Sequence, residues 1–312
     1  MIKKIAVIGT GVIGTGWIIR CLAHNFKVVA YDKDPRLKKK IIEEIRRASP
    51  FVKKLFNKKK INLKNFKYVT SLEVALKDAD FIQENATENY KIKTKLMNLI
   101  GKYAKNNAII SSSSSGLLPT KIYSKCRNPA RTMIGHPFNP VYLCPGVEVV
   151  AGKKTKTKFL NKANKFYKSI SMNPIIVKKE LPGYLADRLQ EALWREGLHI
   201  INEGYATTKD LDRAIEDGPG LRWSLMGTFL TFHLAGGKLG MKHMLEQFGP
   251  ALKLPWTKLK APKLSKKLSS RVISGTKSQA KGKSVAMISS IRDEYLVNLQ
   301  KLRKKYEDKL RK

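Results

Sequence analysis

The sequence predicts an α/β fold in which a doubly wound parallel sheet is followed by an all-helical C-terminal domain. Up to about residue 179, short apolar runs alternate with helical stretches, and this alternation is typical of a parallel sheet covered by helices. After the segment LPGY at 181–184, apolar residues recur only at helical spacing. We therefore predict two domains, over residues 1–180 and 181–312.

Eight apolar runs are the predicted strands of the first domain, at 5–9, 27–32, 67–70, 79–85, 107–111, 131–136, 147–152 and 173–179. Helices fit between several of them, beginning with 14–25 and 35–48, and the basic residues 50–66 are expected to be helix and loop. In the second domain, helical periodicity is found at 184–204, 207–217, 222–235, 238–247 and 287–310. Residues 252–284 are lysine-rich and carry no clear pattern.

The net charge is +38, from 62 basic and 24 acidic residues. Nucleic-acid-binding proteins use such an excess, but here the lysines are spread over the whole chain and no nucleic-acid-binding motif is found. We therefore interpret the excess as a solvated surface whose field attracts anionic ligands, and we expect no nucleic-acid partner.

The sequence also indicates the cellular compartment of the protein. No window approaches the roughly 18 consecutive apolar residues of a membrane span, and the four residues MIKK before the first strand leave no room for a signal peptide. Cys21, Cys126 and Cys144 are far apart and form no CxxC pair, which predicts free thiols and no metal site. We expect a cytoplasmic protein without a membrane partner.

Three glycines in IAVIGTGVIGTGW directly follow the first predicted strand and open the first predicted helix. Gly9 suits the tight turn, Gly11 lets the backbone approach a pyrophosphate, and Gly14 lets the helix pack closely on the strand. The helix N-terminus adds free N–H groups and a positive dipole. Asp32 ends the second strand, where its carboxylate accepts hydrogen bonds from ribose hydroxyls and repels a 2′-phosphate. These residues predict a Rossmann-type domain that binds NAD rather than NADP.

A second candidate site lies in GHPFNPVYLCPGVEVVAG at 135–152, where His136 ends one predicted strand and Glu148 lies in the next. Neighbouring strands bring such residues together, and a carboxylate bonded to one imidazole nitrogen fixes the tautomer and raises the basicity of the other. This base suits removal of a hydroxyl proton while hydride leaves the same carbon. On spacing alone, coincidence stays an open alternative.

Five segments together resemble the L-3-hydroxyacyl-CoA dehydrogenase family: GTGVIG, ENATENYKIK, SSSSSGLLPT, GHPFNP with GVEVV, and LPGYLADRLQEALW. They occur in the family order and at family-like spacings, and the resemblance covers the chain to about Leu259. It implies an NAD-dependent oxidoreductase with a Rossmann domain and a helical domain that usually mediates dimerisation. We therefore expect a homodimer that acts on a small-molecule substrate.

The resemblance also implies roles for individual residues. His136 would be the catalytic acid/base and Glu148 its orienting partner. Counting back from His136 places the family's substrate-binding serine at Ser115, within the run of five serines at 111–115. Glu88 and Lys93 would lie near the nicotinamide ribose. The serine run is then part of an active site and not a linker.

One position departs from the family pattern. Where the acyl-CoA enzymes have an asparagine, this chain has Asp187 in PGYLADR, and an ionised aspartate accepts hydrogen bonds but donates none. An anion beside the substrate suits a substrate with a positive charge. The segment DGPGLRWSLMGTFLTFHLAGG at 217–237 resembles the family branch of L-gulonate and L-carnitine 3-dehydrogenases, more closely the latter. There Arg222 offers a two-pronged donor for a carboxylate, and Trp223 offers an aromatic face for a quaternary ammonium.

The sequence therefore predicts NAD-dependent oxidation of the 3-hydroxyl of L-carnitine to 3-dehydrocarnitine, with His136 as general base held by Glu148. Asp187, Arg222 and Trp223 would bind the substrate. Three alternatives stay open. These are an enzyme for L-gulonate or another 3-hydroxy acid, an enzyme for a 3-hydroxyacyl-CoA ester, and a non-catalytic NAD-binding protein like the lens crystallins of this branch.

Overall fold

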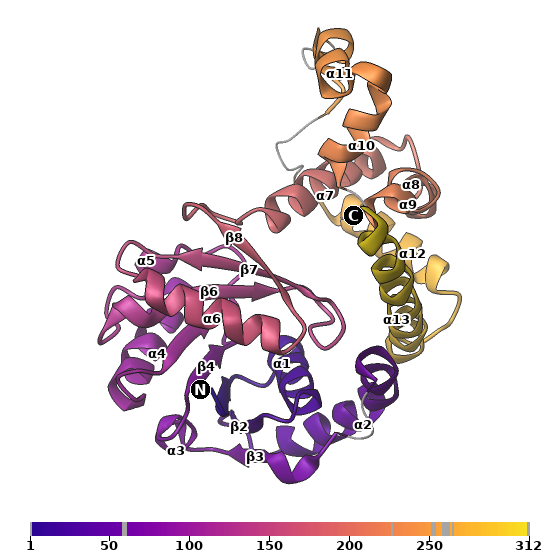
Figure 1. Cartoon of the computed structure of the whole chain (residues 1–312). Helices are drawn as coiled ribbons and strands as arrows, with labels where there is room; N and C mark the ends of the chain where they lie inside the picture. The colour runs from indigo at the N-terminus through magenta and orange to yellow at the C-terminus, as the bar shows by residue number, and fades with distance from the viewer. Residues whose placement is uncertain are drawn as a thin grey trace. The chain divides into compact units, whose positions relative to one another are not determined.

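The computed structural model describes residues 2–57, 61–225, 227–250, 254–257, 263 and 265–310. The chain divides into two compact units, Met1–Arg188 and Leu189–Lys312. The first unit is a sheet covered by helices, and the second is built from helices (Figure 1). Both domain types are those that the apolar patterns predict.

The sheet of the first unit has eight strands in the order β3-β2-β1-β4-β5-β6-β7-β8. They are β1 (Lys4–Ile8), β2 (Lys27–Tyr31), β3 (Phe66–Val69), β4 (Phe81–Glu84), β5 (Ile109–Ser112), β6 (Thr132–Pro137), β7 (Gly146–Ala151) and β8 (Asn173–Val177). Each overlaps one of the predicted apolar runs. Because β1 lies between β2 and β4, the chain reverses its direction of travel across the sheet there, which is where ligands bind in doubly wound folds.

The sheet is parallel, as predicted, except at one pair of strands. β7 runs antiparallel to β6, and the other six neighbouring pairs are parallel. The reason is the length of the connection between them. Residues 138–145 are too few for a crossover helix, so the chain returns directly as an antiparallel neighbour.

Helices cover both faces of this sheet. They are α1 (Val12–Ala23), α2 (Leu37–Phe56), α3 (Leu72–Leu76), α4 (Tyr90–Tyr103), α5 (Pro119–Ile122) and α6 (Thr157–Ser169). Residues of α3, α4 and α5, such as Leu76, Met97 and Ile122, share one buried apolar cluster with the strands. α1 and α6 meet through the rings of Trp17 and Tyr167, whose centroids are 5.7 Å apart. This two-sided burial explains why the central strands read as nearly continuous apolar runs.

α2 extends to Phe56, beyond its predicted end at residue 48. Its apolar positions Ile41, Ile45, Ala48 and Val52 are all at most 2% exposed and follow one another at helical spacing. The apolar face of this helix therefore continues into residues 50–56, where the many lysines hide the helical spacing in the sequence.

The second unit contains the rest of α7 (Ala186–Glu203), which begins in the first unit, and α8 (Thr208–Glu216), α9 (Pro219–Trp223), α10 (Thr228–Ala235), α11 (Met241–Phe248), α12 (Lys266–Ala280) and α13 (Val285–Leu310). The predicted helix at 222–235 is instead two helices, and α12 lies in the stretch without a clear pattern. α12 forms because the Ser265 hydroxyl accepts from the Leu268 N–H at 3.1 Å and Leu268 is fully buried. None of the described helices is long and apolar enough to cross a membrane.

The boundary between the units lies after Arg188, whereas the sequence predicted it after residue 180. Residues 181–188 belong with the first unit because the Tyr184 side chain and two backbone N–H groups are bonded to it. The Tyr184 hydroxyl donates to the Leu117 carbonyl at 2.6 Å, and the Leu185 and Ala186 N–H groups donate to Glu148. The first turn of α7 is therefore part of the first unit.

Candidate active site

The turn between β1 and α1 tolerates only glycine at two positions. Gly9 has a φ of +83°, which L side chains rarely adopt, and a Cβ at Gly14 would lie 1.9 Å from the Gly9 carbonyl oxygen. Gly11 precedes α1, and a Cβ there would meet no atom within 4 Å. The turn thus packs tightly on the strand side and leaves open space at the helix N-terminus, which is the arrangement a pyrophosphate requires.

Asp32, just after β2, is tied to the same turn. Its Oδ2 accepts from the N–H and the hydroxyl of Thr10 at 2.9 and 3.0 Å, and its Oδ1 accepts from the Lys33 N–H at 2.8 Å. A cavity of about 700 Å³ opens beside these residues, lined by the glycine turn, Asp32, Asn85 and the apolar side of α4. The turn, the carboxylate and the cavity fit the adenosine and pyrophosphate of a dinucleotide.

The antiparallel pairing of β6 with β7 places His136 directly opposite Glu148. The imidazole Nδ1 lies 2.8 Å from the Glu148 Oε2, and the two residues are 6% and 0% exposed. An ionised carboxylate only accepts, so Nδ1 carries a proton in this pair and Nε2 is the ring nitrogen that Glu148 does not occupy. The twelve-residue separation in the sequence did not show whether the two side chains meet, and the cross-strand register brings them together.

The other oxygen of Glu148 is also occupied. Its Oε1 accepts from the backbone N–H groups of Leu185 and Ala186 at 2.9 and 3.0 Å. Burial alone raises the pKa of the Glu148 carboxyl, but the hydrogen bonds from His136 and the two amides outweigh burial and hold the pKa below its usual value. Glu148 is therefore a fixed anion behind the imidazole.

Asp187 lies on the opposite side of the ring. Its Oδ1 is 3.9 Å from the His136 Nε2, and its side chain is 30% exposed. His136 is thus flanked by a carboxylate on each ring nitrogen, one in hydrogen-bond contact and buried, the other more distant and partly open to solvent. The position that departs from the family pattern is therefore beside the ring nitrogen that Glu148 does not occupy.

The five serines are part of strand β5 and the loop that follows it. Ser111 and Ser112 belong to β5, and 113–115 begin the loop. Four of the five hydroxyls are hydrogen-bonded to neighbouring side chains. The Ser111 hydroxyl bonds to Tyr167, that of Ser112 to Glu84 and that of Ser114 to Glu88. The Ser113 hydroxyl bonds to Trp17, Gln83 and Asn85. Within the described part of the chain, the Ser115 hydroxyl has no hydrogen-bond partner. The run is a structured element that leaves one hydroxyl available.

Glu88 and Lys93 lie where β4 passes into α4. Lys93 is 1% exposed, and its Nζ donates to both Glu84 oxygens at 2.9 and 3.1 Å and to the Ala86 carbonyl at 2.9 Å. Glu88 Oε2 lies 3.6 Å from the same ammonium, and its side chain is 42% exposed. Contact of this pair with the nicotinamide ribose stays a prediction.

Arg20 supports the site and was missed by the sequence analysis. It is fully buried in α1 and donates to four backbone carbonyls, those of Val141, Cys144, Ile170 and Ser171. Burial lowers the pKa of this guanidinium to about 10. Two of these carbonyls lie in the 138–145 loop between His136 and Glu148. The one signal in the sequence was a lone arginine inside the apolar helix WIIRCLA.

Arg222 and Trp223 belong to the second unit, at the end of α9. Arg222 is exposed and Trp223 is half-buried. Their predicted contact with a substrate stays a prediction.

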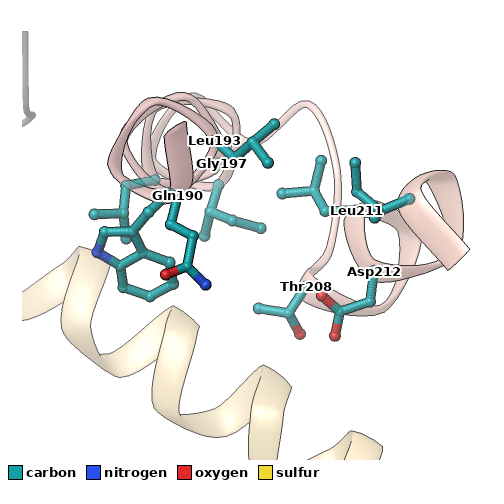
Figure 2. Close-up of a pocket in the computed structure, with 10 residues that line it drawn as sticks. Gln190, Leu193, Gly197, Thr208, Leu211 and Asp212 are labelled. Atoms are coloured by element: carbon teal, nitrogen blue, oxygen red, sulfur yellow. The ribbon is translucent and has the colours of Figure 1, made fainter. Parts of the chain in front are cut away.

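The helical unit also carries a groove of about 540 Å³ between α7 and α8. Figure 2 shows Gln190, Leu193 and Gly197 on one side and Thr208, Leu211 and Asp212 on the other. Leu193 and Trp194 in this groove are 52% and 55% exposed. The groove is thus an apolar surface of the second unit.

Comparison with known proteins shows to which family the chain belongs. Residues 4–181 match the family model of the 3-hydroxyacyl-CoA dehydrogenase NAD-binding domain, and residues 183–282 match that of the 3-hydroxyacyl-CoA dehydrogenase C-terminal domain. The chain belongs to the 3-hydroxyacyl-CoA dehydrogenase family. The resemblance read from the five sequence segments is confirmed, and so is NAD as the cofactor of its first domain.

Relatives in this family are similar over nearly their full length. An L-carnitine dehydrogenase of Oceanobacillus iheyensis is 50% identical over 297 residues, which are 95% of this chain and 97% of the relative. An L-carnitine dehydrogenase of Bacillus cereus is 48% identical, over 98% of this chain and 94% of the relative.

Solved structures agree on the fold of this 3-hydroxyacyl-CoA dehydrogenase family member. The 5-formyl-3-hydroxy-2-methylpyridine 4-carboxylic acid 5-dehydrogenase structure superposes with a TM-score of 0.81, at 23% identity, covering 97% of this chain and 99% of that one. The (S)-3-hydroxybutyryl-CoA dehydrogenase of Ralstonia eutropha gives a TM-score of 0.62 at 25% identity, covering 79% of this chain and 85% of that one.

Proposed function

We propose that the protein oxidises the 3-hydroxyl of L-carnitine to 3-dehydrocarnitine with NAD. The observation that carries this proposal is the Asp187 carboxylate 3.9 Å from the His136 Nε2. In L-carnitine a single methylene separates the carbinol carbon from the quaternary nitrogen, so a carbinol held by His136 brings the cation next to Asp187. An acyl-CoA ester has no cation at that position and gains nothing from the carboxylate. The relatives that are 48–50% identical and named L-carnitine dehydrogenases support the same substrate.

The residues of the site divide the proton chemistry between them. The Ser115 hydroxyl, free of other partners in the described part of the chain, donates to the C3 oxygen. His136 accepts the hydroxyl proton at Nε2, and the Glu148 carboxylate, 2.8 Å from Nδ1, stabilises the imidazolium that forms. Because Glu148 is held by two backbone amides, it fixes the plane of the imidazole before substrate binds.

The cofactor-binding side is formed by the glycine turn and Asp32. Gly9, Gly11 and Gly14 open the turn for the pyrophosphate, and Asp32 binds the adenosine ribose, with Glu88 and Lys93 near the nicotinamide ribose. Bound NAD supplies the hydride acceptor. On the substrate side, Arg222 pairs with the carboxylate of L-carnitine and Trp223 adds an aromatic contact to its ammonium.

The test is NADH formation, followed by absorbance, with L-carnitine, D-carnitine, L-gulonate and 3-hydroxybutyryl-CoA in parallel. Turnover confined to L-carnitine is the expected result. Turnover of L-gulonate or of the CoA ester with L-carnitine inert would refute the substrate assignment. Absence of turnover with all four, together with normal NADH binding, would instead favour the non-catalytic alternative. His136→Ala is expected to abolish turnover while NADH binding survives.

We also propose that the enzyme is a cytoplasmic homodimer whose helical unit supplies the interface. A second copy of this unit is the occupant expected for the groove of Figure 2, because exposed apolar patches of this kind mark protein interfaces. Leu193→Glu is expected to shift the protein to monomers in sedimentation velocity. A wild-type protein that sediments as a monomer would refute this interface.

A further inference from the structure

Glu88 holds the backbone of the serine loop at 114–116. Its Oε1 accepts from the Ser114 hydroxyl at 2.5 Å and from the backbone N–H groups of Ser115 and Gly116 at 3.0 and 3.2 Å. Hydrogen bonds to an ionised acceptor are stronger than those between neutral groups. Three donors from three consecutive residues thus converge on one charged oxygen, which fixes the peptide groups on both sides of the Ser115 side chain.

Glu88 is itself anchored to the sheet. Its other oxygen, Oε2, lies 3.6 Å from the Lys93 ammonium, which is buried and donates to both oxygens of the fully buried Glu84. Glu84 Oε2 accepts from the Ser112 hydroxyl at 2.5 Å. Glu84 and Ser112 are register partners at the carboxyl ends of β4 and β5. Two carboxylates bridged by one lysine therefore hold both ends of the short segment that contains Ser115.

We propose that Glu88 is a positioning residue for Ser115. By fixing the backbone of 114–116 it presents to the substrate oxygen the Ser115 hydroxyl, which alone in the serine run has no partner in the described part of the chain. This role rests on the proposed function, in which Ser115 binds the C3 oxygen. It is separate from the ribose contact predicted from the sequence for Glu88, and the two roles have different consequences when the carboxylate is removed.

The first experiment compares Glu88→Leu, which removes the acceptor, with Glu88→Gln, which keeps an acceptor oxygen without the charge. Glu88→Leu is expected to lower kcat, measured at saturating NAD, about 10–100-fold, since a misplacement of about 1 Å costs about that much. Saturation with NAD removes from this comparison any effect of the proposed ribose contact on cofactor affinity. Glu88→Gln is expected to retain kcat within about fivefold, because the donors keep their acceptor. Glu88 is 42% exposed, so Glu88→Ala serves as a second acceptor-free variant.

The matched control is the neighbouring residue. Asn89 caps α4 by accepting from the Ile92 N–H at 3.1 Å, and within the described residues its side chain forms no hydrogen bond to the serine loop. Asn89→Ala weakens the helix start by about 1 kcal/mol and is expected to leave kcat unchanged within about twofold. A kcat of Glu88→Leu at saturating NAD within about threefold of wild type would overturn the proposal, because any loss at lower NAD would then come from the cofactor contact alone.

A double-mutant cycle tests whether Glu88 acts through Ser115. If it does, Glu88→Leu added to Ser115→Ala lowers kcat by less than about threefold relative to Ser115→Ala alone. Two losses that multiply would mean that Glu88 acts independently of the Ser115 hydroxyl, and the proposal would be wrong.

A final measurement needs no substrate and separates this proposal from the proposed function. Amide hydrogen exchange of the peptide covering 114–117 is expected to speed up about tenfold or more in Glu88→Leu, with little change in Glu88→Gln and Asn89→Ala. Unchanged exchange in Glu88→Leu would refute the anchor even in an active enzyme. If the wild type turned over no hydroxy acid, the proposed function would fail while this measurement still decided whether Glu88 holds the loop.

Discussion

Removing the charge of Asp187 is the perturbation that bears most directly on substrate choice. Asp187→Asn keeps the shape of the side chain and converts one oxygen acceptor into a donor. The structure places this carboxylate 3.9 Å from the His136 Nε2, on the side opposite the buried Glu148. The substitution therefore changes the field at the reactive nitrogen without changing the volume of the site.

The expected magnitude follows from the exposure of Asp187 and from an ammonium placed as far from its carboxylate as the His136 Nε2 is, at 3.9 Å. Two opposite charges about 4 Å apart interact by about 4 kcal/mol at an effective dielectric constant of about 20. The Asp187 side chain is 30% exposed, so solvent screening lowers this figure, and we expect a loss of about 1.4–2.8 kcal/mol. In kcat/KM for L-carnitine this loss is about 10–100-fold.

The assay compares L-carnitine with its neutral isostere, 3-hydroxy-5,5-dimethylhexanoate, in which carbon replaces the quaternary nitrogen. The ratio of the two kcat/KM values is expected to fall about 10–100-fold in Asp187→Asn, because only the charged substrate loses an interaction. Glu191→Gln is the matched control, since Glu191 lies one turn further along α7 and pairs with Arg195 at 3.1 Å. An equal loss for both substrates would refute the cation-binding role and make Asp187 a part of the proton chemistry.

Three further predictions follow from the same geometry. Gly14→Ala is expected to abolish NADH binding, measured by fluorescence titration, because its Cβ would lie 1.9 Å from the Gly9 carbonyl oxygen; binding within threefold of wild type would contradict this packing. The folded-state pKa of Glu148 is lowered from 4.5, so the stability that its carboxylate contributes is present above that pH and is lost as pH falls through the folded pKa. The free energy of unfolding by urea, measured at pH 6 and pH 4, should therefore depend less on pH in Glu148→Gln than in the wild type. An equal pH dependence in the two proteins would contradict the assignment. Arg20→Met leaves four carbonyls without their donor and is expected to lower the free energy of unfolding by about 3–5 kcal/mol, with Arg20→Lys intermediate in the same urea experiment; a loss below about 1 kcal/mol would contradict this role.

The strands and the cofactor turn could be predicted from local sequence. Runs such as IAVIG are buried on both faces, so their burial appears as an unbroken apolar stretch, and the glycine pattern reports local sterics between residues five apart. Helix ends were predictable where a cap is encoded nearby, as at Thr207, whose hydroxyl accepts from the Asp210 N–H.

Other elements were missed because their signals are weak in the sequence. α12 lies in a lysine-rich stretch whose apolar residues are sparse, and it forms through a serine cap and the burial of Leu268. The direction of β7 depends on the length of the loop before it, which an alternating pattern of strands and helices does not report.

The sequence by itself determined the fold class and the dinucleotide turn, because each depends on local periodicity or on a motif of contiguous residues, and it singled out the candidate site residues through their motifs. Only the tertiary structure decided which of these residues meet. Antiparallel register sets His136 against Glu148, the first turn of α7 brings Asp187 to the other ring nitrogen, and Glu88 reaches across to the serine loop. These contacts join segments 12 to 51 positions apart, and pairings over such separations are fixed by strand order and helix packing rather than by neighbouring residues.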